Sequence, residues 1–182
     1  MTNLNHPAEL ALHGYLDRVV NGKAGFSKFT AIQIGRDVQD AVLRQFGRGK
    51  QRPFKLRMSN VGRPYCQLWF EKNKPETAIP KPTTFIMNML LGDIIEAIFK
   101  GLLKEAEVKY IDSEKVTLNA KNVNIDGTFD LVIDGAVDDI KSASDWSYKN
   151  KFASYEVLKD NDAFGYVGQL AGYAKATGQK PG

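Results

Sequence analysis

The chain has little thiol and little imidazole chemistry to offer. Among its 182 residues there is one cysteine, Cys66, and there are two histidines, His6 and His13, both near the N-terminus. One cysteine excludes a disulfide framework within the chain and a zinc or iron–sulfur site built from several of its thiolates. Two histidines exclude a three-histidine metal site, and a Ser-His-Asp or Cys-His catalytic group would depend on the N-terminal segment. If the protein is an enzyme, carboxylates, lysine, amides and hydroxyls must carry its chemistry.

Long apolar runs and the common nucleotide-binding loops are also missing. No apolar stretch approaches the roughly 18–20 residues that span a bilayer, so we expect no membrane partner. The opening residues MTNLNHPAEL have neither a basic region nor an apolar core, and they do not resemble a secretory signal. The GxGxxG and GxxxxGKS/T patterns do not occur, so nucleotide-binding folds lose their usual sequence support.

What the sequence does have is positive charge concentrated in one place. The net charge is +4, and seven cationic residues but no acidic residue lie between Ala41 and Phe70. A basic block on an otherwise nearly balanced chain indicates contact with a polyanion, and a solvated basic loop is the alternative. The cations are Arg44, Arg48, Lys50, Arg52, Lys55, Arg57 and Arg63.

Apolar residues at helical spacing, with capping and stop residues at their ends, predict five helices. Gly47 and Gly49 follow the second helix, Thr83 caps the fourth, and Gly178 ends the fifth. The third, YCQLWFE, is typical of a short buried helix, and the following KNKPETAIPKP is typical of a loop because of its prolines. The predicted helices cover residues 8–21, 29–46, 65–71, 83–103 and 153–177.

Between the fourth and fifth helices, short runs of alternating apolar and polar residues are separated by Asp-Gly pairs. This pattern predicts an antiparallel meander of four strands. Helices, then a meander, then a helix indicate an α/β fold of the mixed α+β kind. The chain stops a few residues after the last helix, and we expect more protein to follow Gly182 in the natural gene. The predicted strands cover residues 106–111, 115–125, 128–133 and 136–142.

The segment GTFDLVIDGAVDDIKSAS, residues 127–144, carries the most informative pattern. Its Asp134-Gly135 pair predicts a two-residue hairpin turn, because glycine tolerates the positive φ that such turns require. Counting outward from that turn places Asp130 opposite Asp139. The two carboxylates become direct cross-strand neighbours, with Cβ atoms about 4.5–5.5 Å apart.

Two ionised carboxylates placed so close together are unfavourable unless a cation accompanies them. At about 5 Å they repel by roughly 3 kcal/mol at an effective dielectric constant near 20. A divalent cation would offset this repulsion, and Mg²⁺ commonly binds one or two carboxylates together with waters and substrate phosphates. Lys141 shares a face with Asp139 and would orient the attacking water or neutralise charge on a phosphate. The alternative is a solvent-facing strand pair in which Lys141 only screens two acids.

These residues resemble the motifs of a nuclease superfamily. Gly127 and Asp130 form a GxxD motif, and Asp139, Ile140 and Lys141 form a DxK motif. Found in this order on two successive predicted strands, the motifs resemble the PD-(D/E)XK nuclease superfamily.

Three further segments narrow the resemblance to the RecB-like branch, which includes the CRISPR-associated four-cysteine exonucleases. Gln169 and Tyr173 resemble its QxxxY motif. Residues 92–96 resemble its GxxxH motif, with Glu96 in place of histidine. Residues 59–70 resemble the region around the branch's first cysteine, so that the likeness extends over about residues 59–178.

The resemblance implies a restriction-endonuclease-like αβββαβ core over residues 83–182. Residues 1–82 would then form an N-terminal helical extension that carries the basic DNA-contacting region. The predicted helix at 83–103, the meander and the last helix supply most of this core. Its last strand is expected beyond Gly182.

The resemblance also assigns roles around a metal ion. Asp130, Asp139 and the backbone carbonyl of Ile140 would bind Mg²⁺ or Mn²⁺. Glu96 would complete the site from the first core helix, and a solvated helix acid is the alternative for this residue. Lys141 would position the nucleophilic water.

The QxxxY pair and the cysteine complete the expected site. Gln169 and Tyr173 are four residues apart on one helix face, where they would hold a DNA phosphate or the metal-facing network. Ordinary packing is the alternative for this pair. The iron–sulfur form of the branch needs three more cysteines, so no cluster is expected in this chain, and Cys66 is expected to be a small buried side chain.

The function implied is Mg²⁺- or Mn²⁺-dependent hydrolysis of DNA phosphodiester bonds. The resemblance favours an exonuclease that acts on linear DNA in phage or bacterial DNA processing, recombination or degradation, in the cytoplasm of a bacterial or phage-infected cell. The basic block would follow the DNA backbone without reading its sequence. The alternatives are an endonuclease of the same fold, a non-catalytic DNA-binding module and a structural protein. Polarity, strand preference and oligomeric state stay open.

Overall fold

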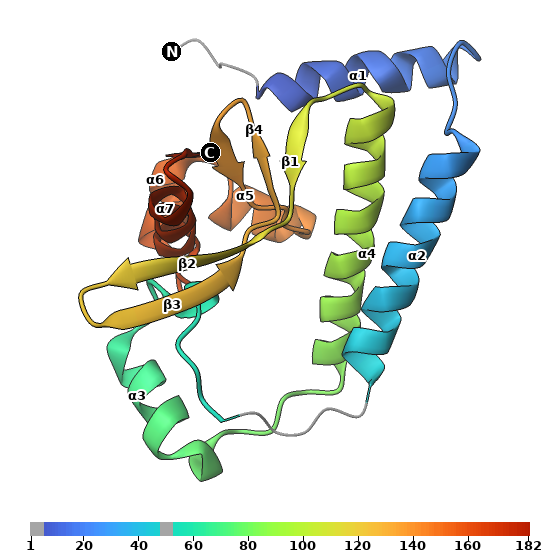
Figure 1. Cartoon of the computed structure of the whole chain (residues 1–182). Helices are drawn as coiled ribbons and strands as arrows, with labels where there is room; N and C mark the ends of the chain where they lie inside the picture. Colours follow the sequence, from blue (N-terminus) through green and yellow to red (C-terminus); the bar gives the residue numbers. More distant parts are fainter. Residues whose placement is uncertain (1–5, 48–52) are drawn as a thin grey trace. The chain divides into compact units, whose positions relative to one another are not determined.

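The computed structural model describes residues 6–47 and 53–182. Within these ranges it is a mixed α+β protein with seven α-helices, two short 3-10 helices and two small sheets (Figure 1). This confirms the predicted general class. The two compact parts into which the chain divides are called here the helical unit and the α/β unit.

The two units interleave along the chain. The helical unit contains the described parts of residues 1–49 and 81–110, and the α/β unit contains those of residues 50–80 and 111–182. This division differs from the predicted one, which placed a single boundary after residue 82. The reason is that the long helix that follows this boundary packs along the N-terminal helices.

The helical unit consists of α1 (Pro7–Val20), α2 (Lys28–Phe46) and α4 (Thr84–Glu105). These helices confirm the first, second and fourth predicted helices, and α2 and α4 lie side by side (Figure 1). Ser27 caps α2 by accepting a hydrogen bond from the backbone N–H of Thr30, and its hydroxyl donates to Glu105 at 2.8 Å. Thr83 takes the N-cap position of α4 as predicted, but its side chain makes no capping hydrogen bond to the described residues.

The α/β unit holds the other elements, apart from Tyr110, the first residue of β1. Strands β1, β4, β5 and β6 form one sheet in that order, while β2 and β3 form a separate antiparallel hairpin. In the larger sheet β4 is antiparallel to β5, and β6 is parallel to β5. The strands are β1 (Tyr110–Asp112), β2 (Lys115–Ala120), β3 (Val123–Thr128), β4 (Leu131–Ile133), β5 (Ala136–Asp138) and β6 (Lys180–Pro181). The helices are η1 (Met58–Asn60), α3 (Tyr65–Asn73), η2 (Pro75–Thr77), α5 (Asp145–Lys151), α6 (Tyr155–Asp160) and α7 (Tyr166–Thr177).

The core of the α/β unit forms around Tyr173 of α7, which is buried together with Met58, Phe129 and residues of β3, β4 and β5. Gly127 lies where this packing is tightest. A Cβ at Gly127 would lie 2.4 Å from Met58 Cβ and 2.7 Å from Tyr173 Cε1. The glycine of the GxxD motif is therefore required by packing, because no side chain fits between η1 and α7 at this point.

The strands differ from the predicted meander in four ways. The first predicted strand is represented only by the short β1. The second is a hairpin, because Lys121 adopts a positive φ of 53° and the chain turns between β2 and β3. The third begins only at Leu131, after a bend, and the fourth ends at Asp138. After the last helix the chain forms one more short strand, β6.

The last predicted helix is broken into α6 and α7, and α5 was not predicted at all. Between α6 and α7, Gly165 adopts a left-handed φ of 77°. A Cβ at Gly165 would lie 2.6 Å from the carbonyl oxygen of Val61, so this glycine both turns the chain and lets two backbones touch. Gly178 ends α7 in the left-handed conformation, as predicted.

Helix α3 forms where the third helix was predicted, but it is not buried. None of its residues, all of which the structure describes, belongs to the core. Cys66 on this helix is exposed, so the expectation of a buried cysteine is wrong. Tyr65 and Phe70 of this helix are exposed as well.

Candidate functional site

The β4–β5 hairpin has the predicted register. Leu131 pairs with Asp138 and Ile133 with Ala136, on either side of the Asp134-Gly135 turn. Leu131 and Asp138 form the last pair of the ladder at the end away from the turn. Asp130 and Asp139 lie just beyond this pair, so they are not the direct cross-strand partners that the sequence predicts. Instead Asp130 Oδ2 accepts a hydrogen bond from the backbone N–H of Ile140 at 2.8 Å. This bond brings the Asp130 carboxylate to the peptide that joins Asp139 to Ile140.

Lys141 lies beside the Asp139 carboxylate, as the DxK motif predicts. Its Nζ is 2.5 Å from Asp139 Oδ2, and the Asp139 side chain is only 8% exposed. The Lys141 ammonium also lies 5.5 Å from the centre of the Tyr166 ring. The Lys141 ammonium therefore compensates part of the hydration that the buried Asp139 carboxylate has lost.

The QxxxY pair of α7 reaches the same place. The Tyr173 hydroxyl donates to the carbonyl oxygen of Thr128 at 2.6 Å. Burial raises the pKa of Tyr173 above its ordinary value of 10.0, a hydrogen bond with the Gln169 side chain lowers it, and the charges of Asp139 and Asp130 raise it. The phenol therefore stays neutral at pH 7 and acts as a hydrogen-bond donor. It also lies close enough to Asp130 and Asp139 for their charges to affect its pKa.

Tyr166 lies next to Lys141, and Arg63 lies near Tyr166. Burial raises the pKa of Tyr166, the Lys141 charge lowers it, the Asp139 charge raises it, and Arg63 has a further lowering effect. Arg63 also lies 3.9 Å from Glu71 and is only partly exposed. One cation of the basic block thus lies near Tyr166, whose ring is 5.5 Å from the Lys141 ammonium.

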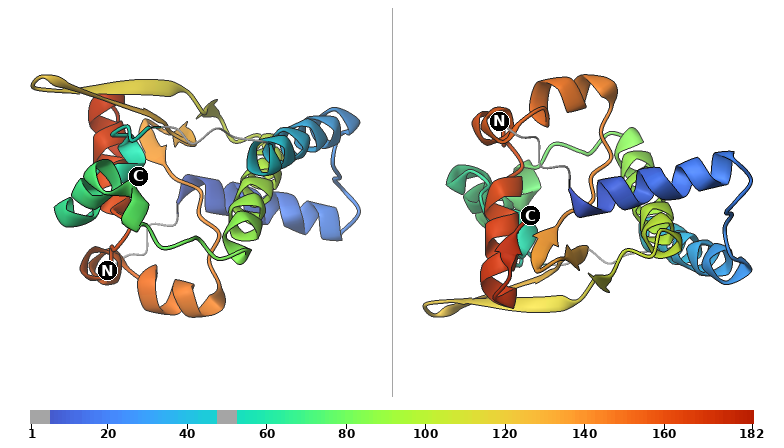
Figure 2. Two further views of the ribbon diagram at one scale, coloured as in Figure 1. Left: turned by 90° about the horizontal axis from the view of Figure 1, so that it is seen from below. Right: turned by 90° about the horizontal axis from the view of Figure 1, so that it is seen from above.

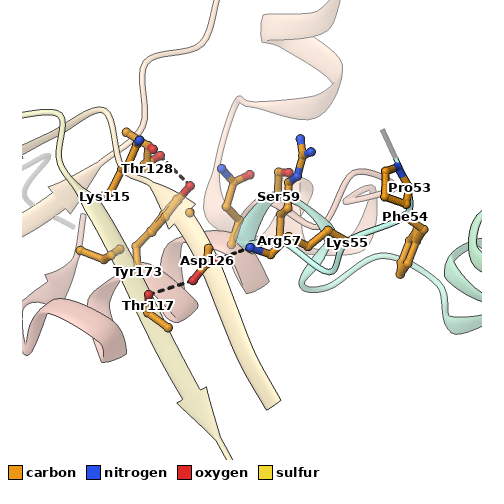
Figure 3. A pocket seen from close by; sticks show the side chains of 13 residues that line it. Pro53, Phe54, Lys55, Arg57, Ser59, Lys115, Thr117, Asp126, Thr128 and Tyr173 are labelled. Carbon is orange, nitrogen blue, oxygen red and sulfur yellow. Dashed lines mark hydrogen bonds and ion pairs between the residues drawn. The ribbon is translucent and has the colours of Figure 1, made fainter. Parts of the chain in front are cut away.

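An open hollow of about 1110 Å³ adjoins the site (Figure 3). Tyr173 and Gln169 line one side, residues 53–59 another, and the β2–β3 hairpin a third. Its cationic side chains are Lys55, Arg57 and Lys115. A groove with several cations and little acid is suited to a phosphate backbone.

The acid in the hollow is Asp126. Lys55 Nζ lies 2.5 Å from its Oδ2, and the Thr117 hydroxyl donates to its Oδ1 at 2.8 Å (Figure 3). The Lys55 hydrogen bond, and then that of Thr117, lower the pKa of Asp126 below its ordinary value. Asp126 is therefore ionised at neutral pH and holds Lys55 against the hairpin.

Sequence reasoning missed Lys115, Thr117 and Asp126 as members of this surface. Lys115 and Thr117 alternate on β2, and Thr117 pairs with Asp126 in the hairpin register. Polar residues do recur with period 2 here, but a single strand predicted over residues 115–125 leaves out the hairpin that places Asp126 opposite Thr117.

Two of the remaining predicted site residues belong to the other unit, and three lie outside the described residues. Glu96 and Arg44 belong to the helical unit, where Glu96 pairs with Lys100 at 2.9 Å and Arg44 with Asp93 at 3.0 Å. Arg48, Lys50 and Arg52 lie outside the described residues. In the described part of the chain, no group of three or more His, Cys, Asp or Glu side chains is arranged to hold a metal ion.

Comparisons with known proteins add nothing to this geometry, since no family model, no curated protein and no solved structure matches the chain. Among residues 6–47 and 53–182, no helix has both the length and the apolar character needed to cross a bilayer.

Proposed function

We propose that the protein is a Mg²⁺- or Mn²⁺-dependent DNA nuclease, and that it acts as an exonuclease on linear DNA. One observation carries the proposal. The residues of the GxxD, DxK and QxxxY motifs, which lie up to about 45 positions apart in the sequence, meet at the end of the β4–β5 hairpin beside a cation-lined hollow. A solvated strand pair with a screening lysine gives no reason for such a meeting.

The donor groups suit the proposed ion. Asp130, Asp139 and the Ile140 carbonyl offer oxygen ligands only, which is the ligand set that Mg²⁺ and Mn²⁺ prefer. Two carboxylates are sufficient, because Mg²⁺ usually keeps several waters and shares substrate phosphates. When bound, the ion would polarise the scissile phosphate and lower the pKa of a bound water.

The remaining residues of the site would compensate charge, hold the backbone near the two aspartates in position, or bind the DNA. The Lys141 ammonium lies against Asp139 and would compensate charge that develops on the phosphate. Tyr173 is a positioning residue, because its hydroxyl holds the Thr128 carbonyl and thereby fixes the start of the GxxD bend. Lys55, Arg57 and Lys115 would bind the sugar–phosphate backbone in the hollow.

The proposal includes the αβββαβ core. Along the chain, α4 is followed by the sheet strands β1, β4 and β5, then by α7 and β6. The parallel pairing of β6 with β5 after an intervening helix supports a crossover of the kind this core requires. The short strands and the separate β2–β3 hairpin are additions to that plan.

The test is digestion of end-labelled linear DNA with Mg²⁺ or Mn²⁺, compared with the same reaction in EDTA. We expect degradation only with metal, and a loss of about 100-fold or more in Asp139→Asn. Asp134→Asn is the matched control, since Asp134 is exposed at the hairpin turn and asparagine tolerates its positive φ. This control should retain the activity.

Closed circular DNA separates the modes of attack. An exonuclease leaves the circle intact, whereas cleavage of the circle would make the protein an endonuclease. Salt-sensitive DNA binding without any metal-dependent cleavage would contradict the enzyme proposal and favour a non-catalytic DNA-binding module.

A further inference from the structure

The segment between Lys141 and α7 carries an aromatic surface that the proposed catalytic residues do not use. Trp146 and Tyr148 of α5, Tyr155 of α6 and Phe164 in the following loop are between 52% and 63% exposed. Figure 2 shows α5 and α6 set apart from the strands of the same unit. Large exposed aromatic side chains on one short segment indicate a binding surface, because burying them inside the fold would be favourable.

Phe164 connects this surface to Lys141. A small pocket of about 160 Å³ is lined by Lys141 and Lys151, by the rings of Phe152, Phe164 and Tyr166, and by serine hydroxyls. The rings of Phe164 and Tyr166 are stacked with their centres 5.6 Å apart, and Phe152 lies 5.9 Å from Tyr166. The proposed catalytic lysine therefore forms part of the wall of an aromatic pocket.

Positive charge accompanies the aromatic rings. The Lys151 ammonium lies 5.8 Å from the centre of the Trp146 ring, and Lys141 lies over Tyr166. Lys149 pairs with Asp145 on the exposed side of α5. Ring faces with ammonium groups between them match a ligand that alternates flat π-systems with negative charges.

A nucleic-acid strand has this alternation, and the strand must be unpaired. In a duplex each base is stacked on its neighbours and its faces are covered, so exposed side-chain rings cannot stack on it. In a single strand the bases can turn outward and stack on aromatic side chains. This stacking depends little on the base sequence, because every base has a flat π-face.

We propose that α5, α6 and the loop to α7 form a stacking surface for single-stranded DNA, which delivers an unpaired end to Lys141. This deepens the proposed nuclease function and rests on it for the direction toward Lys141. Binding of single strands to the aromatic surface can be measured without any cleavage.

The experiment measures binding in EDTA, where no metal-dependent cleavage occurs. In the Trp69→Phe protein, Trp146 is the only tryptophan, and its fluorescence reports contact with a base. We expect oligothymidylate to quench this fluorescence and a blunt duplex of equal length to have little effect. Fluorescence anisotropy of a labelled oligothymidylate with the unsubstituted chain gives a second measurement that does not depend on that variant.

Phe164→Ala should weaken oligothymidylate binding by at least about fivefold, the effect of losing one stacked base. Phe70→Ala is the matched control, because Phe70 has the same exposed fraction as Phe164, 52%, but lies on α3. This control should bind as the unsubstituted protein does.

The outcomes separate this inference from the nuclease proposal. Metal-dependent cleavage that prefers duplex ends and is unchanged in Phe164→Ala would overturn the stacking surface and leave the nuclease standing. Single-strand binding that is lost in Phe164→Ala, without cleavage under any metal condition, would support the surface and overturn the nuclease.

Discussion

Two lysine–aspartate pairs in the α/β unit have the same chemistry and the same distance but opposite surroundings. Lys55 and Asp126 meet at 2.5 Å in the hollow, where their side chains are 60% and 46% exposed. Lys141 and Asp139 also meet at 2.5 Å, but the Asp139 side chain is almost fully buried. Water screens the first pair and hardly reaches the second carboxylate.

The difference shows how burial changes the role of an ion pair. Solvent screens the exposed pair, so under the proposed function Lys55 would leave Asp126 for a DNA phosphate at little cost. The buried Asp139 has lost hydration and depends on a cation beside it. Lys141 supplies that cation here, and the same need makes the position attractive to a divalent metal.

The largest expected effect comes from removing each lysine in turn. Lys141→Ala should lower the rate of metal-dependent DNA cleavage by about 100-fold or more, since it removes charge compensation at the reacting phosphate. Lys55→Ala should change this rate only a few-fold. It should instead weaken DNA binding and reduce the slope of log affinity against log salt concentration by about 1.

Cleavage rates with end-labelled DNA and binding at several salt concentrations measure both effects. Circular dichroism of each variant checks that the fold is kept, and Lys141→Gln provides a second variant with a similar chain length. Equal losses of cleavage in the Lys55 and Lys141 variants would mean that burial does not distinguish the two pairs.

A smaller effect is expected at Gly127, which directly follows Asp126 on β3. Asp126 belongs to the exposed ion pair with Lys55, whereas the next residue, Gly127, packs against Met58 and Tyr173 in the core. Gly127→Ala should reduce the free energy of unfolding by about 1–3 kcal/mol, because its Cβ would overlap Met58 and Tyr173.

Denaturant unfolding checks this prediction, with Gly35→Ala of α2 as the control. Nothing lies within 4 Å of a Cβ at Gly35, and alanine is the better helix former, so this variant should gain about 0.5–1 kcal/mol. An unchanged stability of Gly127→Ala would show that η1 and α7 can separate, and that the core around Tyr173 is looser than described.

The smallest effect concerns pH. The pKa of Asp126 is lowered by Lys55 and Thr117, so the pair contributes its full stability above the ordinary pKa near 3.8. The contribution is lost as pH falls below that value and through the lowered pKa of the folded state. The stability difference between the unsubstituted chain and Asp126→Asn should therefore be constant from pH 7 to about pH 5 and shrink in stronger acid.

Unfolding curves recorded across this pH range provide the measurement. A difference that disappears well above pH 5 would mean that Asp126 is not held ionised by its two partners. Such a result would remove the electrostatic contrast between the hollow and the buried pair.

How much the sequence predicts depends on whether a local signal exists. The register of the β4–β5 hairpin follows from Asp134-Gly135, and both residues adopt the positive φ expected of this turn, 48° and 77°. The β2–β3 hairpin has no such signal, because Lys121 provides its positive φ without a glycine. The break between α6 and α7 was not predicted for a related reason. It depends on the close approach of Gly165 to Gly62, which occurs only in the folded chain.

The candidate site divides in the same way. Order and spacing of the motifs predicted that Asp139 and Lys141 lie together beside the hairpin turn, because two-residue turns are set by neighbouring residues. Tertiary structure decided that Asp130 binds the Ile140 backbone, that Asp139 is buried against Lys141, and that Glu96 lies in a different unit.

Local sequence therefore determined the turn, the main helices and the identity of the charged residues, since these depend on backbone preferences over a few positions. Burial, ion pairing and the hollow beside Tyr173 were decided only when distant segments packed together. The physical reason is that desolvation depends on every atom that surrounds a group, and those atoms come from parts of the chain that no local pattern connects.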